Sequence, residues 1–197
     1  KKLKEEWFLL SSANSINIGR LIPQIVYYFY GYFDLINKQK IKEGDKINIV
    51  VPTGNFGNIL AAYYGKKMGL PIGKLICSSN ENNVLTDFLN TGVYDRRRKL
   101  ILTESPSMDI LISSNLERLL YYASNKNTQK VSKWMHELNE NGRYQIDDNT
   151  FNTIKNLFAC GSVDDNNTSL EIKSVYDKAK YVLDPHSAIA YKVAKEC

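Results

Sequence analysis

The chain has 197 residues, of which 43% are apolar and 24% are charged, and its formal net charge is +5. This composition is typical of a soluble globular protein, and it excludes intrinsic disorder because apolar residues are plentiful and the net charge is small. The three cysteines, Cys77, Cys160 and Cys197, lie far apart, so we expect no metal site and reduced thiols in a cytoplasmic protein.

Neither the basic residues nor the apolar runs favour a nucleic-acid partner or a membrane span. The one dense basic run, at 96–99, is predicted to be a solvated loop. The apolar run at 27–33 is too short to cross a bilayer. We therefore expect neither a nucleic acid nor a membrane as a partner.

The first predicted element is a helix over 11–33. Ser11, Ser12, Asn14 and Ser15 are candidate N-caps. Pro23 is expected in the first turn or at a kink. Apolar residues recur at helical spacing and are predicted to face the core: Leu21, Ile22, Ile25, Val26, Phe29, Tyr30 and Phe33.

Short apolar runs then alternate with helical patterns, which predicts an α/β fold. Strands are expected at 47–51, 74–79 and 99–103. A helix that ends near Met68 and a short helix at 82–90 lie between them. This order predicts a mostly parallel, doubly wound sheet.

The second half is predicted to be mainly helical. Ser113 or Ser114 is expected to cap a helix that runs to about Tyr122. The polar segment 125–163 is predicted to be helical, as an insertion or an outer layer. Two more helices are expected at 169–181 and after Ser187.

The most informative segment joins the strand at 47–51 to the following helix. It contains Gly54, Asn55, Phe56, Gly57 and Asn58. Ligands bind at the carboxyl ends of parallel strands, and helix N-termini hold anions. Glycines that adopt a positive φ let the backbone approach a phosphate closely. Because no lysine or arginine lies inside, the segment predicts one phosphate group held by backbone amides, or else a plain tight turn.

Four segments, in chain order, resemble the threonine synthase family. VPTGNFGN followed by ILAAYYGKKMGLP is similar to the family's cofactor-phosphate loop, and SSANSINIGRLIPQIVYYF is similar to its substrate-side helix. SPSMDILISSNLERLL resembles the segment after the third strand, and LDPHSAIAY resembles a late D-P-H-[ST]-A motif. The resemblance covers about 11–191 and implies a pyridoxal-phosphate enzyme of fold type II, with a tryptophan-synthase-β-like fold.

The resemblance also implies an activity, the conversion of O-phospho-L-homoserine and water to L-threonine and phosphate by a carbon–oxygen lyase. It implies that pyridoxal 5'-phosphate is bound by Gly54, Asn55, Phe56, Gly57 and Asn58. Ser15, Asn17 and Arg20 would bind the substrate. For Ser15 and Asn17 the alternative is helix capping, and for Arg20 it is a surface ion pair.

The family's Schiff-base lysine and its late hydroxyl residue fall outside this resemblance. We therefore expect 1–197 to be the central part of the cofactor-binding domain, incomplete at both ends and inactive alone. Asp109, Ser114 and Asn115 lie in a matched segment without an assigned role. His186 stays open between acid–base chemistry and a structural role.

Three alternatives remain open. A related lyase would yield 2-oxobutyrate and ammonia from the same pocket. A non-catalytic module would use the loop to bind a small anion, and a scaffold would use it only as a turn. The oligomeric state is left open.

Overall fold

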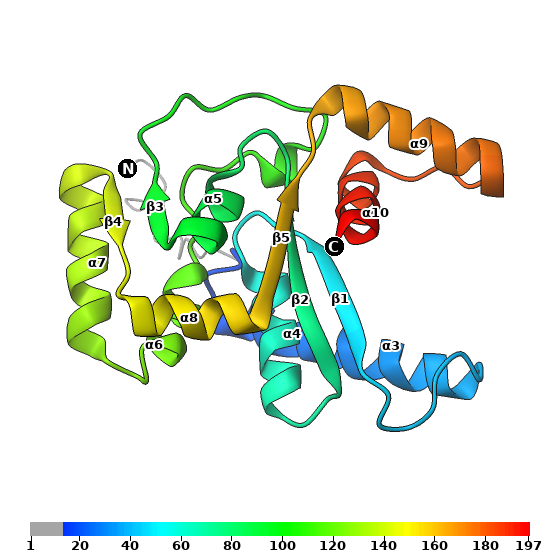
Figure 1. The fold of residues 1–197 in the computed structure, drawn as a ribbon, viewed down its shortest axis with the longest axis horizontal. Coiled ribbons are helices and arrows are strands. Elements are labelled where there is room, and N and C mark those ends of the chain that lie inside the picture. The colour runs from blue at the N-terminus through cyan, green and yellow to red at the C-terminus, as the bar shows by residue number, and fades with distance from the viewer. Residues whose placement is uncertain (1–13) are drawn as a thin grey trace, which may run out of the picture.

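The computed structural model describes residues 14–197 (Figure 1). The predicted caps Ser11 and Ser12 lie outside the described residues. A three-stranded parallel sheet forms the centre of the fold, with β1 (Ile47–Pro52), β2 (Ile72–Ser79) and β5 (Phe158–Ser162) in the order β1-β2-β5. The predicted parallel sheet is therefore confirmed.

Helices cover both faces of this sheet. On one face α4 (Gly57–Lys67) and α5 (Val84–Thr91) share a buried core with β2. On the other face α10 (Pro185–Glu196) buries Ile189 and Val193 against Ile76. A Cβ atom on Gly161 of β5 would lie 2.9 Å from Val193, so this glycine lets α10 approach the sheet. The doubly wound arrangement thus agrees with the prediction.

The predicted strand at 99–103 is wrong. This segment is irregular, and Leu102 is 85% exposed. The side-chain amide of Asn82 donates to the Ile101 carbonyl (2.8 Å) and accepts from the Ile101 N–H (2.9 Å). Asn82 therefore takes the hydrogen-bonding groups that a neighbouring strand would use. Figure 1 shows this segment arching over the molecule after β3 (Val93–Asp95).

The third strand comes instead from the segment 125–163, which is not helical throughout. It contains α7 (Thr128–Asn141), β4 (Arg143–Gln145), α8 (Asp148–Leu157) and β5. β5 pairs with β2 in the central sheet, and β4 pairs antiparallel with β3. The segment therefore supplies part of the main sheet as well as an outer layer.

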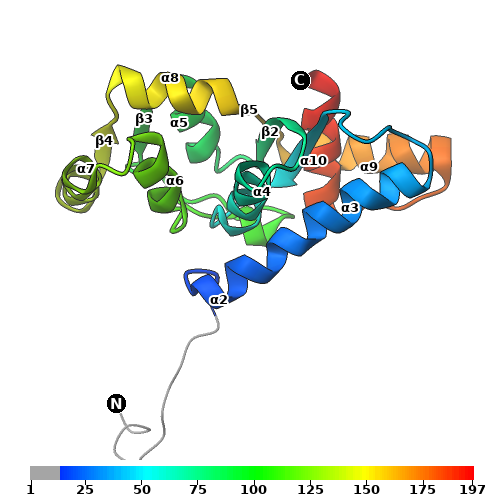
Figure 2. The same cartoon turned by 90° about the horizontal axis from the view of Figure 1, so that it is seen from below.

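The first helical region is broken into α2 (Ile18–Leu21), a 3₁₀ turn (Ile22–Gln24) and α3 (Ile25–Asn37). Pro23 lies in the 3₁₀ turn, at the expected break. The predicted core-facing row is wrong for four of its members, because α3 packs on α4 through one face only. Phe29 contacts Gly65 of α4, whereas the outer row is half exposed or more: Ile22, Val26, Tyr30 and Phe33. Figure 2 shows α3 as an outer helix.

The remaining elements are a 3₁₀ turn (Pro106–Met108), α6 (Leu116–Ala123) and α9 (Asp165–Ala179). The residue at the N-cap of α6 is Asn115, so the predicted caps Ser113 and Ser114 are wrong. Among residues 14–197, no helix is both long and apolar enough to cross a membrane, and no three potential metal ligands gather. The cysteines are free thiols, and burial raises the pKa of Cys77 to about 12.

Candidate functional site

The predicted phosphate loop lies between β1 and α4 and lines a small pocket. The pocket has a volume of about 200 Å³. All five predicted cofactor-binding residues line it: Gly54, Asn55, Phe56, Gly57 and Asn58. Ser15 and Arg20 line it as well, although they are far away in the sequence. The structure thus brings together seven of the eight predicted site residues.

Helix α4 begins in this pocket without a capping side chain. Its N-cap residue is Phe56, which has a left-handed backbone (φ 60°) and a side chain buried in the core. The N–H groups in the first turn of a helix have no acceptor within the helix. They carry a partial positive charge, so the start of α4 is suited to an anion.

The two glycines of the loop serve close packing rather than a positive φ. The left-handed conformation falls on Phe56, not on Gly54 or Gly57. A Cβ atom on Gly54 would collide with the Ser107 carbonyl oxygen, and one on Gly57 would lie 3.4 Å from the Asn115 amide nitrogen. The loop is therefore pressed against the segment 107–115 from behind.

Polar groups from that segment bind the carbonyl oxygens of the loop. The Ser113 hydroxyl donates to Gly54 (2.8 Å). The backbone and side-chain amides of Asn115 both donate to Asn55, at 3.1 and 2.9 Å. With its carbonyls engaged, the loop offers its N–H groups to a ligand.

The substrate-side residues divide into two groups. Asn17 does not line the pocket, and its side chain accepts a hydrogen bond from the Gly19 N–H (2.8 Å) as the cap of α2. Arg20 and Ser15 do line it. Among the described residues that line this pocket, Arg20 is the one lysine or arginine, and no aspartate or glutamate is present. Arg20 is thus the cationic side chain that this wall contributes to the pocket.

Asn58 connects the loop to the first helices. The side-chain amide of Asn58 donates to the side-chain oxygen of Gln24 (2.9 Å). The backbone carbonyl of Asn58 accepts a hydrogen bond from the Tyr28 hydroxyl (2.9 Å). Burial raises the pKa of Tyr28, so this hydroxyl stays a donor at neutral pH. These bonds hold the turn that carries Arg20 next to α4.

Lys66 and Lys67, which follow the loop on α4, do not line the pocket. Lys66 donates to the carbonyls of Ile72 and Gly73, at the start of β2. Burial and the nearby Lys46 and Lys74 lower the pKa of Lys66. Because parallel strands begin at the edge opposite their carboxyl ends, this lysine lies away from the loop.

A second polar cluster follows β2 and was not predicted from the sequence. The side-chain amides of Asn80 and Asn82 donate to the same Asp109 oxygen, at 2.8 and 2.9 Å. Thr103 donates to Asp109 through its hydroxyl (2.8 Å) and its N–H (3.0 Å). The cluster satisfies its own groups and anchors the segment that carries Ser107, which indicates a structural role for Asp109. The sequence signal for this cluster is the pair Asn80 and Asn82, which comes just after the end of β2.

His186 lies apart from the loop pocket. Asp184 caps α10, and hydrogen bonds from the Ser187 hydroxyl and nearby N–H groups lower the pKa of Asp184. The Nδ1 atom of His186 lies 3.2 Å from a carboxylate oxygen of Asp184. Its Nε2 atom is buried without a hydrogen-bond partner in the described part of the chain. Neither residue lines the phosphate pocket.

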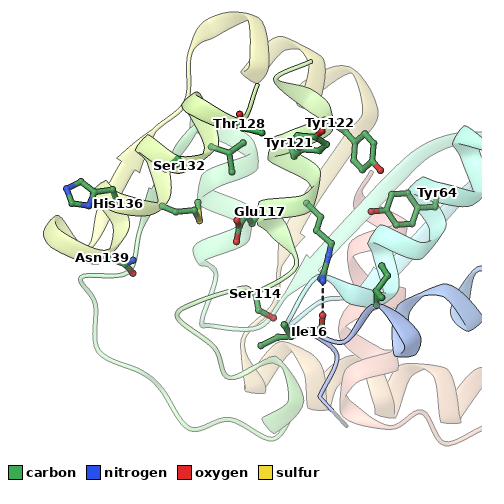
Figure 3. Close-up of a pocket in the computed structure, with 14 residues that line it drawn as sticks. Ile16, Tyr64, Ser114, Glu117, Tyr121, Tyr122, Thr128, Ser132, His136 and Asn139 are labelled. Atoms are coloured by element: carbon green, nitrogen blue, oxygen red, sulfur yellow. Dashed lines mark hydrogen bonds between the residues drawn. The ribbon is translucent and has the colours of Figure 1, made fainter. Parts of the chain in front are cut away.

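A larger groove lies elsewhere, between α6 and α7, with a volume of about 860 Å³. Figure 3 shows Ser114, Tyr64 and His136 around it. Its lining includes none of the eight predicted site residues. The pocket at the phosphate loop is therefore smaller than this groove, and volume does not identify the predicted site.

No family model matches the chain, but known proteins do. Human threonine synthase-like 1 is 48% identical over 187 residues, which cover 94% of this chain and 25% of the relative. The threonine synthase of Saccharomyces cerevisiae is 42% identical over 193 residues, covering 91% of this chain and 37% of the enzyme. The chain thus spans a quarter to about two fifths of the length of these curated relatives.

Solved structures agree with these matches. The PLP-bound threonine synthase of Brucella melitensis superposes with a TM-score of 0.90 at 43% identity, over 95% of this chain and 39% of that chain. The Escherichia coli enzyme superposes with a TM-score of 0.68 at 27% identity, over 95% of this chain and 36% of that chain. The fold is therefore that of part of a fold-type-II PLP enzyme.

Proposed function

Because this chain is homologous to threonine synthases along nearly its whole length, we propose that it forms the part of such an enzyme that holds the cofactor phosphate. The complete enzyme would convert O-phospho-L-homoserine and water to L-threonine and phosphate. A C–H bond at the β carbon and the C–O ester bond at the γ carbon break, which releases phosphate and a proton, and the hydroxyl and hydrogen of water then add at the β and γ carbons. The observation that carries the proposal is the uncapped start of α4, with Arg20 in the same pocket.

The pocket fits the phosphate arm of pyridoxal 5'-phosphate rather than a whole ligand. Its volume of about 200 Å³ is below the roughly 300–1,000 Å³ of pockets that enclose small molecules. Backbone N–H groups of an uncapped helix and one arginine match a phosphate monoester in charge and hydrogen bonding. When bound, the cofactor supplies an electron sink for the α and β carbons of the substrate.

The described residues then have specific tasks. The N–H groups of Gly57 and Asn58, in the first turn of α4, would donate to the cofactor phosphate. The Arg20 guanidinium pairs with an anionic oxygen of cofactor or substrate through its planar fork. The Ser15 hydroxyl lies on the same wall as Arg20 and donates to the Asn14 side chain (3.3 Å), so it would leave Asn14 to donate to the substrate. Since no lysine among residues 14–197 lines the pocket, we assign no proton transfer to these residues.

The proposal is tested with protein expressed from the complete reading frame and supplied with pyridoxal 5'-phosphate. O-phosphohomoserine is added, and the amino-acid and keto-acid products are separated by chromatography. We expect threonine and an equal amount of phosphate. Formation of 2-oxobutyrate and ammonia would show that the protein is the related lyase and would overturn the synthase assignment. The absence of any product would overturn the enzyme assignment. The 197-residue chain, assayed alongside, shows whether this segment suffices.

A further inference from the structure

Asn115 occupies the N-cap position of α6, but its side chain does not cap that helix. Asparagine at an N-cap normally accepts a hydrogen bond from the first turn and stabilises the helix by about 0.5–2 kcal/mol. Asn17 and Asn127 do this at the starts of α2 and α7. The side chain of Asn115 is fully buried and directed elsewhere.

The amide of Asn115 joins the two walls of the phosphate pocket. Its Nδ2 atom donates to the Asn55 carbonyl (2.9 Å), in the phosphate loop, and to the Ser15 carbonyl (3.1 Å), in the turn before Arg20. These two segments are far apart in the sequence. The phosphate loop contributes backbone N–H groups to one wall of the pocket, and the other segment contributes the Arg20 guanidinium to the other wall. One side chain therefore holds both walls.

Arg118, one turn later on α6, fixes the orientation of this amide. Its Nη1 atom donates to Asn115 Oδ1, and its Nη2 atom donates to the Ile16 carbonyl (2.7 Å), the bond drawn to Ile16 in Figure 3. With a charged donor on Oδ1, the amide must present Nδ2 to Asn55 and Ser15. The same charge polarises the amide and strengthens the bonds that it donates.

We propose that Asn115, oriented by Arg118, is a positioning residue that sets the spacing between the phosphate loop and the Arg20 turn. The inference rests on the proposed function, in which these two walls hold one phosphate group. Asn115 itself acts through the carbonyls of Asn55 and Ser15. Its loss widens the pocket, so the phosphate arm loses contact with one wall while the rest of the cofactor site is kept.

The test compares two ligands that differ only in the phosphate. Protein from the complete reading frame is titrated with pyridoxal 5'-phosphate and with pyridoxal by absorbance, and with inorganic phosphate by amide NMR shifts. In Asn115→Leu, which keeps the shape but removes the amide, we expect about tenfold weaker binding of pyridoxal 5'-phosphate and phosphate, equivalent to about 1.4 kcal/mol. Pyridoxal binding should change less than about twofold, a difference near 0.4 kcal/mol.

Two further variants complete the design. Arg118→Lys keeps the charge but cannot bind Asn115 and Ile16 together, so we expect a smaller loss in the same direction. Asn139→Leu, at an exposed position of α7, is the matched control and should change neither affinity. If Asn115→Leu does not fold, Arg118→Lys decides the question.

The outcomes separate the inference from the proposed function. Equal weakening of pyridoxal and pyridoxal 5'-phosphate would mean a general loss of structure and would overturn the positioning role. Unchanged binding of both would overturn it as well. If the wild-type protein binds neither phosphate nor pyridoxal 5'-phosphate, the proposed function itself fails.

Discussion

Helices α4 and α10 pack on opposite faces of the same sheet, but they begin in different ways. At α10, Asp184 accepts hydrogen bonds from the N–H groups of His186 (3.0 Å) and Ser187 (3.2 Å). At α4, the N-cap is Phe56, which offers no acceptor. A helix that caps itself has already used its donors, whereas α4 keeps them for something outside the chain. Because α6 also begins without a side-chain cap, the uncapped start of α4 points to a ligand only together with the pocket that it lines and the Arg20 side chain there.

The largest effect is expected from a change in the loop that precedes α4, because this loop positions the N–H groups at the start of that helix. In Gly54→Ala the new methyl group meets the Ser107 carbonyl, which belongs to an anchored segment. We expect a loss of about 1–3 kcal/mol in the free energy of unfolding, as for overpacked cores, together with loss of phosphate binding. Urea denaturation and a phosphate titration measure the two effects.

The matched control is Gly31→Ala. A Cβ atom on Gly31, inside α3, meets nothing within 4 Å. This change should stabilise the protein by about 0.5–1 kcal/mol, because alanine favours a helix. If Gly54→Ala behaved like Gly31→Ala, the close packing behind the loop would have no role.

A second change makes α4 resemble α10. Asn55 is exposed beside the start of α4, so Asn55→Asp places a carboxylate where an anion would bind. We expect about tenfold weaker phosphate binding through repulsion, which corresponds to about 1.4 kcal/mol, with no loss of stability because the carboxylate suits a helix start. Isothermal titration with phosphate measures the change. Asn139→Asp on α7 is the control for net charge, and equal effects of the two variants would contradict the prediction.

Removing the cation of the pocket should have a smaller effect. In Arg20→Met we expect about fivefold weaker phosphate binding, equivalent to about 1 kcal/mol, and a weaker dependence of binding on salt, because one charge contact is lost. The phosphate affinity of Arg20→Lys should lie between those of Arg20→Met and the wild type. Titrations at two salt concentrations test this, and an unchanged salt dependence would exclude Arg20 from the anion site.

The smallest effect on phosphate binding is expected at α10. Asp184→Ala should lower the free energy of unfolding by about 1 kcal/mol through loss of the cap, without any change in phosphate binding. Because the pKa of Asp184 is lowered in the folded protein, its contribution is present above the pKa of the unfolded chain. It is lost as the pH falls through the folded pKa. The stability curves of variant and wild type should therefore converge on acidification, and a constant gap down to pH near 2 would contradict this.

The sequence predicted the elements whose conformation depends on neighbouring residues, and it failed where a contact from a distant residue decides the conformation. The β-branched run at 47–51 and the glycines that follow it predicted β1, the loop and α4. The strand at 99–103 was mispredicted because a side chain 17 to 21 residues earlier, that of Asn82, binds the backbone there. β5 was missed because its short run contains Gly161 and Cys160, which fit against α10 and α5 only in the folded protein.

The site shows the same division. The loop residues, Ser15 and Arg20 were predicted from motifs, and they do share one pocket. The part played by Asn115 was not predictable, because an asparagine before a helix is most simply interpreted as its cap. Only the three-dimensional structure shows that its amide reaches Asn55 and Ser15.

The outer row of α3 has a practical consequence for this chain in solution. The row contains Val26, Tyr30 and Phe33 of α3 and continues to Ile22 in the preceding 3₁₀ turn, at a spacing of three or four residues, and Tyr30 is 73% exposed. Exposed apolar patches favour self-association, so we expect association rather than unfolding to limit the usable protein concentration. Because Tyr30 belongs to no core cluster, a lysine at this position should raise solubility and leave the phosphate loop intact.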